Sequence, residues 1–244
     1  MLIFVYFKAK SYYAIGLYPI YMAFGAVYIE KIFETGWKRW LRVLAIALPV
    51  LFFIPMLKRS FPLKEPNQLI EDARKEGLDK HRWEDGKEYP ISQDFADMLG
   101  WRELAIKTES LFFKINKEKS TIVICDNYGE AGAINYYKAT EAFRAQSFNA
   151  DYLIWLDEEL KKSNIEYSDM IFVRQPGRDA PAEAHQAFEN IVVVDSITHP
   201  WARELGTRIF WFKNAKVNLR EYLQTIVTSQ LNEAKTGKRK EENQ

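Results

Sequence analysis

Two lysines and two tyrosines near the start of the chain form the first group with chemical potential. Lys8 and Lys10 stand two residues apart, and Tyr12 and Tyr13 follow closely. Ammonium and phenol groups donate hydrogen bonds to phosphate oxygens, and an apolar run continues directly after them. The pattern therefore predicts contacts with the phosphate of a membrane lipid. Ordinary anchoring at a membrane interface uses the same residue types and remains an alternative.

A second group follows a strand-like run, Ser120–Asp126, and opens what reads as a helix. The first backbone N–H groups of a helix lack partners within it, so they attract anions. We therefore treat Asn127, Tyr128 and Glu130 as candidate ligand-binding residues. The glycine spacing matches neither the dinucleotide nor the P-loop pattern, and a helix cap at Asn127 with a turn at Gly129 explains the same residues structurally.

Several other kinds of active site find no support in the sequence. His81, His185 and His199 are scattered without the spacing of paired metal ligands, and the single cysteine, Cys125, lies inside an apolar run. There is no G-x-S-x-G segment around a serine nucleophile. We expect no metal, no cofactor and no intrachain disulfide, and we name no catalytic residue.

The composition separates the chain into two parts. Lys+Arg is 34 and Asp+Glu is 33 over 244 residues, so there is no basic excess of the kind that nucleic-acid binding requires. Residues 1–57 carry only eight charged side chains, with a net charge of +4, whereas roughly a third of the remaining residues are charged. The first part therefore suits a lipid bilayer and the second suits water.

Two uncharged runs in the first part predict transmembrane helices. They are Ser11–Ile29, with 19 residues, and Val43–Leu57, with 15 residues. A bilayer core needs about 20 predominantly apolar residues in a helix, and tyrosines and tryptophans at the ends of these runs fit the two interfaces. The alternative is a pair of helices buried in a water-soluble protein.

A basic hairpin, Glu30–Arg42, joins the two runs. The positive-inside rule places it in the cytoplasm and places everything after Leu57 on the opposite side. We expect a multi-pass protein of the cytoplasmic membrane with an extracytoplasmic C-terminal domain. The apolar opening reads as the end of an earlier helix, so we expect Met1 to be internal or a truncated start.

The second part predicts a linker over 58–93, an α/β domain over 94–232 and a disordered tail over 233–244. The expected strands are Ser120–Asp126, Asp169–Arg174, Asn190–Asp195 and Thr207–Lys213. The expected helices are Gln68–Glu76, one from Ser92 with a break at Gly100, one from Asn127 to Lys138, Asp157–Ser163, Ala180–Phe188, Trp201–Leu205 and Asn218–Asn232. Strands that alternate with helices indicate an α/β fold with a mostly parallel sheet.

Four segments resemble one known family, in the same order along the chain. They are KAKSYYAIGLYPIYMAFGAVYIEK (Lys8–Lys31), FADMLGWRELA (Phe95–Ala105), DNYGEAGAINYY (Asp126–Tyr137) and THPWARELGTRIFWFKNAK (Thr198–Lys216). These segments are similar to bacterial family 39 glycosyltransferases, which are relatives of dolichyl-phosphate-mannose–protein mannosyltransferases and of the aminoarabinose transferase of lipid A. The resemblance covers most of residues 8–216.

The resemblance implies transfer of a sugar from a polyprenyl-phosphate donor to an acceptor outside the cytoplasmic membrane. In that reaction, cations and phenols near the leaving lipid phosphate stabilise its charge. The resemblance thus implies lipid-phosphate contacts for Lys8, Lys10, Tyr12 and Tyr13, with Lys10 and Tyr13 the first choices. It implies a lipid bilayer and a polyprenyl-phosphate sugar as partners, and it specifies neither the sugar nor the oligomeric state.

Two departures from the family pattern limit this expectation. The family's catalytic acidic residue lies in a first extracytoplasmic loop that this chain does not contain, and Ser147–Trp155 lacks the histidine of the family's Gly-His-Asn loop. We therefore expect the C-terminal portion of a transferase, inactive by itself. The alternatives are a membrane-anchored accessory or sugar-binding domain without enzymatic activity, and a soluble nucleotide-binding protein that buries residues 1–57.

Overall fold

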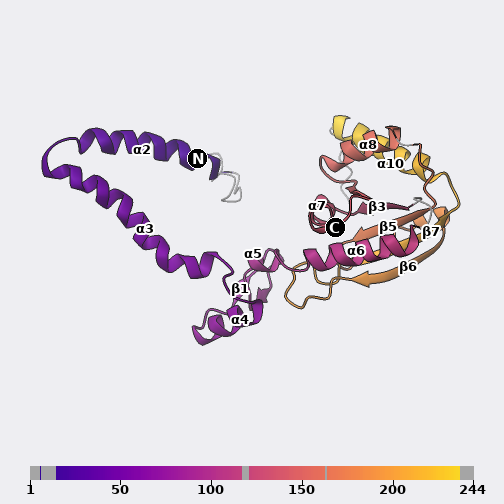
Figure 1. The fold of residues 1–244 in the computed structure, drawn as a ribbon, viewed down its shortest axis with the longest axis horizontal. Coiled ribbons are helices and arrows are strands. Elements are labelled where there is room, and N and C mark those ends of the chain that lie inside the picture. Colours follow the sequence, from indigo (N-terminus) through magenta and orange to yellow (C-terminus); the bar gives the residue numbers. More distant parts are fainter. Residues whose placement is uncertain (1–5, 7–14, 117–120, 163, 237–244) are drawn as a thin grey trace. The chain divides into compact units, whose positions relative to one another are not determined.

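The computed structural model describes residue 6 and residues 15–116, 121–162 and 164–236. The chain divides into two compact units, Met1–Glu65 and Pro66–Gln244 (Figure 1). The described part of unit 1 is helical, whereas unit 2 combines helices with strands.

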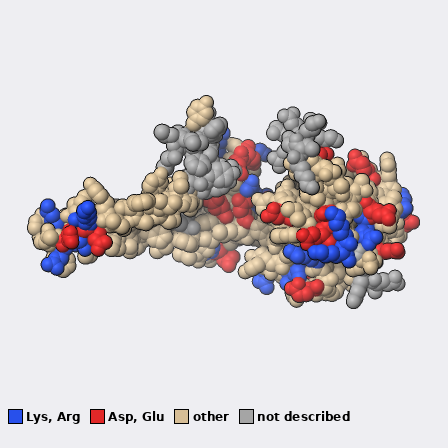
Figure 2. Space-filling view, turned by 90° about the horizontal axis from the view of Figure 1, so that it is seen from above, with Lys and Arg blue, Asp and Glu red and all other residues tan. Residues whose placement is uncertain are grey.

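The described part of unit 1 contains two α-helices, α2 (Tyr18–Ile32) and α3 (Trp40–Ser60). The segment between them contains the 3₁₀ turn η2 (Gly36–Arg39). Within the described part of the chain, one helical stretch is long and apolar enough to cross a membrane: Gly36–Leu57, with 22 residues and a mean hydropathy of 2.2. No part of that stretch is buried in the structure. Figure 2 shows charge gathered at the turn between the helices and little along their length.

The first predicted span has a different outcome. Ser11–Ile29 begins outside the described residues, and from Tyr18 onward it belongs to α2, which has 15 residues and no buried side chain. A membrane crossing needs about 20 residues. The described structure therefore supports one candidate span, and the second stays a prediction.

Unit 2 contains a mixture of helices and strands. Its helices are α4 (Pro66–Lys75), α5 (Gln93–Ala96), α6 (Trp101–Ile115), α7 (Tyr128–Tyr137), α8 (Tyr152–Lys162), α9 (Ala184–Ala187) and α10 (Leu219–Thr236). Its strands are β1 (His81–Arg82), β2 (Glu88–Tyr89), β3 (Thr121–Cys125), β4 (Ala145–Ser147), β5 (Asp169–Arg174), β6 (Phe188–Ser196) and β7 (Arg208–Ala215). All four expected strands are present, whereas the short helix expected at Trp201–Leu205 is a series of turns.

The main sheet is mixed, and the expectation of a mostly parallel sheet is wrong. The strand order is β4-β3-β5-β7-β6, in which β3 runs parallel to β4 and β5 while β7 runs antiparallel to β5 and β6. A parallel connection needs a crossover of a dozen or more residues, usually a helix. The connection from β6 to β7 forms turns without a helix, so the chain folds back as an antiparallel pair.

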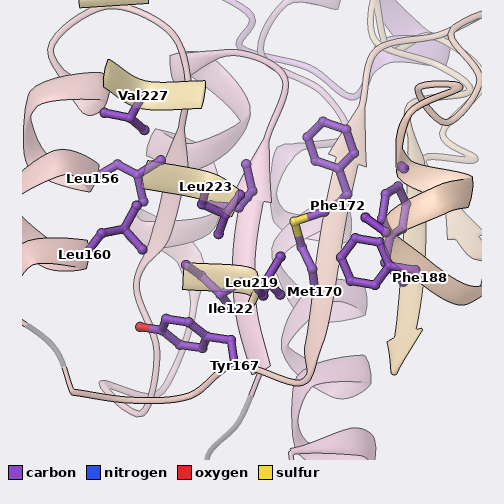
Figure 3. Close-up of a cluster of buried hydrophobic side chains, with 14 of the residues drawn as sticks. Ile122, Leu156, Leu160, Tyr167, Met170, Phe172, Phe188, Leu219, Leu223 and Val227 are labelled. Atoms are coloured by element: carbon purple, nitrogen blue, oxygen red, sulfur yellow. The ribbon is translucent and has the colours of Figure 1, made fainter. Parts of the chain in front are cut away.

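Helices cover both faces of this sheet. On one face, Leu156 of α8 and Leu223 of α10 lie in one buried cluster with Ile122 of β3 and Phe172 of β5 (Figure 3). On the other face, α6 and α7 enclose a second cluster that includes Val123. The β3 side chains are buried on both faces, as a continuous run of β-branched residues requires.

The first residues of unit 2, from Pro66 to the start of α6, are folded against the rest of that unit. Trp201 donates its indole N–H to Asn67 Oδ1 at 2.7 Å, and Arg203 donates its backbone N–H to the Ala96 carbonyl at 3.1 Å. The Arg203 guanidinium also pairs with Asp97 at 3.1 Å. The expected linker, 58–93, thus contains α4 and the β1–β2 hairpin from Pro66 onward.

A side chain of α7 covers the edge strand β4. Asn135 donates from Nδ2 to the Ala145 carbonyl at 2.8 Å and accepts from the Ala145 backbone N–H at 2.9 Å. Exposed strand edges are templates for pairing with other chains. Asn135 therefore closes this edge at Ala145 and fixes the position of β4 beside α7.

Candidate functional site

The second group of predicted site residues lies where β3 ends and α7 begins. The carboxyl ends of parallel strands are the edge at which α/β sheets place functional groups. Asn127, Tyr128 and Glu130 are brought together here in the first turn of α7. The Tyr128 side chain is exposed, whereas Glu130 is fully buried.

Asn127 and Glu130 form a capping box. Asn127 Oδ1 accepts the backbone N–H groups of Gly129 at 2.8 Å and Glu130 at 3.1 Å. Glu130 Oε2 in turn accepts the Asn127 backbone N–H at 3.2 Å. Unpaired N–H groups at the start of a helix attract anions, but these bonds already give two of them, those of Gly129 and Glu130, a partner. The structure thus shows the capping role of Asn127 directly.

Glu130 carries an unusual carboxyl group. Burial raises its pKa to about 8, and the nearby charges of Asp126 and Glu204 act in the same direction. Burial also raises the pKa of Glu204. Within the described residues, Glu130 Oε1 has no hydrogen-bond partner. A carboxyl group in this state holds its proton at neutral pH and can act as a hydrogen-bond donor.

Three arginines surround the same end of the sheet. Arg174 and Arg208 lie directly opposite each other in the β5–β7 pair, where two like charges destabilise a sheet unless they are compensated. Arg174 pairs with Asp126 at 3.2 Å, and Arg208 pairs with Asp179 at 2.9 Å. Arg178 also lies 3.6 Å from Asp126. We call these three arginines and two aspartates the arginine corner.

The arginine corner can bind an anion only by exchanging existing bonds. Its three guanidinium groups exceed its two carboxylates by one positive charge, and neutral Glu130 does not cancel that excess. However, Arg208 also donates to the Arg178 carbonyl at 2.8 Å, and Arg174 donates to the Asp179 carbonyl. The corner therefore holds the loop after β5 in place. The sequence alone did not predict this group, although an arginine ends the predicted strand Asp169–Arg174 and another lies near the start of the predicted strand Thr207–Lys213.

Asp195 does not join this group. It lies on β6 and pairs with Lys107 of α6 at 2.8 Å. Lys107 also bonds Glu103 at 2.7 Å, and Glu103 accepts the Thr198 hydroxyl at 2.6 Å. Burial alone would raise the pKa of Glu103, but these hydrogen bonds outweigh it and lower the pKa to about 2. Thr198, the first residue of the family-like segment Thr198–Lys216, is thus bonded to α6. This contact is structural.

The remaining candidates can be placed briefly. Cys125 is buried in β3, and burial raises the pKa of its thiol, so it is a poor nucleophile. In the described ranges, no three His, Cys, Asp or Glu side chains are grouped to hold a metal ion. Lys8, Lys10, Tyr12 and Tyr13 lie outside the described residues.

Two surface grooves lie away from the capping box. One runs between α6 and β6 and includes Lys107 and Val194, and the other runs between α8 and β4 and includes Gln146 and Trp155. Neither is lined by Asn127, Tyr128 or Glu130.

Comparisons of the chain with models of protein families, with curated proteins and with solved structures find no match.

Proposed function

We propose that this chain is the C-terminal membrane and extracytoplasmic portion of a glycosyltransferase of the cytoplasmic membrane. The complete enzyme would transfer a sugar from a polyprenyl-phosphate donor to an acceptor outside the cytoplasm. The proposal places the acidic residue that activates the acceptor hydroxyl in a part of the enzyme nearer its N-terminus. It assigns to this chain the lipid-phosphate contacts and the water-exposed domain.

One observation carries this proposal. The 22 residues of Gly36–Leu57 are strongly apolar and unburied, and they precede a unit that has its own core. In water such a helix would expose large apolar side chains at a high free-energy cost. A lipid bilayer removes that cost. The ordered family-like segments supply the reaction class, because a membrane helix by itself indicates no chemistry.

The lipid-phosphate contacts are part of the same proposal. Lys10 and Tyr13 would donate charge-assisted hydrogen bonds to the phosphate as it leaves the sugar, with Lys8 and Tyr12 beside them. A lysine near the end of a membrane span can place its ammonium group in the headgroup layer, because its side chain is long.

Membrane fractionation with protease protection tests the location. We expect the full chain to remain in the membrane fraction after alkaline extraction, and protease added outside spheroplasts to remove the residues after Leu57. Recovery of the whole chain as a soluble protein without detergent would contradict the proposal. Sugar transfer by this chain alone would contradict the assignment of catalysis to another part of the enzyme.

Binding of polyprenyl phosphate in nanodiscs tests the lipid contacts. Replacing Lys10 by Ala removes one charge-assisted bond, so we expect affinity to fall about tenfold. Tyr13→Phe should weaken binding less. Lys31→Ala is the matched control, because it removes the same charge at the other end of the same predicted span. Equal losses in the Lys10 and Lys31 variants would indicate a general charge effect and would rule out a specific contact.

A further inference from the structure

The groove between α8 and the edge strand β4 combines an aromatic ring with hydrogen-bond donors and hydrogen-bond acceptors. It has a volume of about 270 Å³ and is lined by Arg144, Gln146, Trp155, Glu158, Glu159 and Lys162. Pockets for small molecules usually measure about 300–1,000 Å³, so this groove suits a ligand smaller than those that such pockets hold.

Trp155 supplies the apolar surface of the groove. Its side chain lies on α8 and is 42% exposed. Tyr152 meets the indole edge to face at a centroid distance of 4.8 Å, and the Arg144 guanidinium lies 5.1 Å from its centroid. These two contacts fix the ring while part of it stays open to the groove.

Several polar groups of the groove have unused hydrogen-bonding capacity. Gln146 is 1% exposed and donates from Nε2 to Glu159, but its Oε1 has no partner in the described structure. A buried amide oxygen in this state is normally paired. The Arg144 side chain is exposed and its guanidinium lies over the Trp155 ring, so the N–H donors at the edge of the guanidinium can reach a ligand beside that ring.

The charges in the groove cancel. Arg144 and Lys162 offset Glu158 and Glu159, and Lys162 pairs with Glu158 at 2.9 Å. An anion or cation would favour a site with a net opposite charge, as in the arginine corner. A neutral ligand with many hydroxyl groups instead needs donors and acceptors side by side. It also needs an aromatic surface for its C–H groups.

We propose that this groove binds one neutral sugar residue, with its C–H face against Trp155 and its hydroxyl groups bonded to Arg144, Gln146 and Glu159. Its use as an acceptor-glycan site rests on the proposed function, whereas the binding itself does not. The two can fail separately, because sugar binding requires neither the lipid donor nor membrane insertion.

Saturation-transfer NMR on the full chain tests the proposal. The chain is held in lauryldimethylamine oxide, a detergent without a sugar headgroup, and the probes are maltotriose, cellotriose, chitotriose and mannotriose at millimolar concentration. We expect at least one of these neutral trisaccharides to bind. Trp155→Ala should weaken that binding about tenfold or more, because the ring is the central contact.

Two further variants make the result decisive. Trp155→Phe retains an aromatic surface and should retain part of the affinity, which excludes simple misfolding as the cause of the loss. Tyr136→Ala removes an 81% exposed aromatic side chain of α7 that does not line the groove, and it should leave affinity unchanged. Binding of none of the four sugars, or equal binding by the wild-type and Trp155→Ala chains, would overturn the proposal.

Discussion

The buried carboxyl group of Glu130 shows how one side chain can serve structure at an energetic cost. Its Oε2 completes the capping box of α7, so the helix gains a bond that its own backbone cannot make. Its Oε1 lies buried without a partner in the described residues. The carboxyl group therefore stays protonated at neutral pH, and its ionisation opposes folding.

Replacing Glu130 by Gln should flatten the dependence of stability on pH. The carboxyl pKa rises from 4.5 to about 8 on folding, so the folded chain retains a proton that the unfolded chain releases between these values. The free energy of unfolding should thus fall as pH rises through this window, by up to about 1.4 kcal/mol per pH unit. The amide of the Glu130→Gln variant has no proton to lose in this range, and its oxygen could still accept the Asn127 N–H.

Denaturant unfolding at several pH values between 5 and 8, followed by tryptophan fluorescence, measures this slope. Glu76→Gln is the matched control, because Glu76 is exposed and the same chemical change should leave the slope intact. Glu204, whose pKa is also raised by burial, should keep part of the slope in the Glu130→Gln variant. Identical slopes in the wild-type and Glu130→Gln chains would show that Glu130 is not the group responsible.

At the scale of the elements, one glycine controls how α6 begins. Gly100 adopts φ +85° immediately before α6, where the chain turns between α5 and α6. A Cβ at this position would lie 2.8 Å from Ile197 Cγ2 and 3.1 Å from Ala202 Cβ. The turn therefore needs glycine both for its backbone conformation and for the close approach of the segment after β6.

Gly100→Ala should destabilise unit 2 more than Gly177→Ala does. Gly177 has φ +78°, but a Cβ added there would meet no atom within 4 Å, so this position isolates the backbone effect. Left-handed backbone costs a non-glycine residue about 1–2 kcal/mol, and overpacking should add about 1–3 kcal/mol at Gly100 alone. Thermal or denaturant unfolding of both variants measures the difference. Equal destabilisation would mean that Ile197 and Ala202 move aside without cost.

At the scale of the whole molecule, the two units differ in how far they bury their apolar side chains. Unit 2 buries its apolar side chains in clusters on both faces of a sheet, whereas α3 leaves its apolar side chains exposed. Among the described residues, nothing in unit 1 covers the Gly36–Leu57 stretch. The proposed membrane location follows from this difference.

A charge in the middle of this stretch should reduce membrane insertion. Ile46→Arg places a guanidinium near the centre of the span, which costs about 2.5–3.5 kcal/mol in a bilayer. Trp37→Arg is the matched control, because Trp37 lies at the end of the stretch and the two side chains are similarly exposed, at 71% and 72%. Protease added outside spheroplasts should reach the residues after Leu57 less in the Ile46 variant than in the Trp37 variant, because a failed crossing leaves them in the cytoplasm. Equal protease access in both variants would indicate that a charge at position 46 does not affect a crossing by α3.

Local sequence was sufficient to predict most of the elements and the cap. Short apolar runs predicted β3, β5, β6 and β7, but only β3 and β5 are buried nearly throughout, as such a run leads one to expect of a strand covered on both faces. The side chains of β6 are mostly exposed or half-buried. Asn127 three residues before Glu130 is likewise the local pattern of a helix start. The strand β4 was missed, since its three residues, Ala145–Ser147, carry no such run.

Only the tertiary structure decided the strand directions and the partners of the charged side chains. The direction of β7 depends on how the chain returns from β6, and the opposition of Arg174 to Arg208 depends on the register that results. The groove beside Trp155 likewise exists only because β4 joins the sheet next to α8. Periodicity and capping depend on neighbours within a few residues and can be read from the sequence. Contacts between distant segments depend on which packing buries the most apolar surface, and a single sequence does not display that choice.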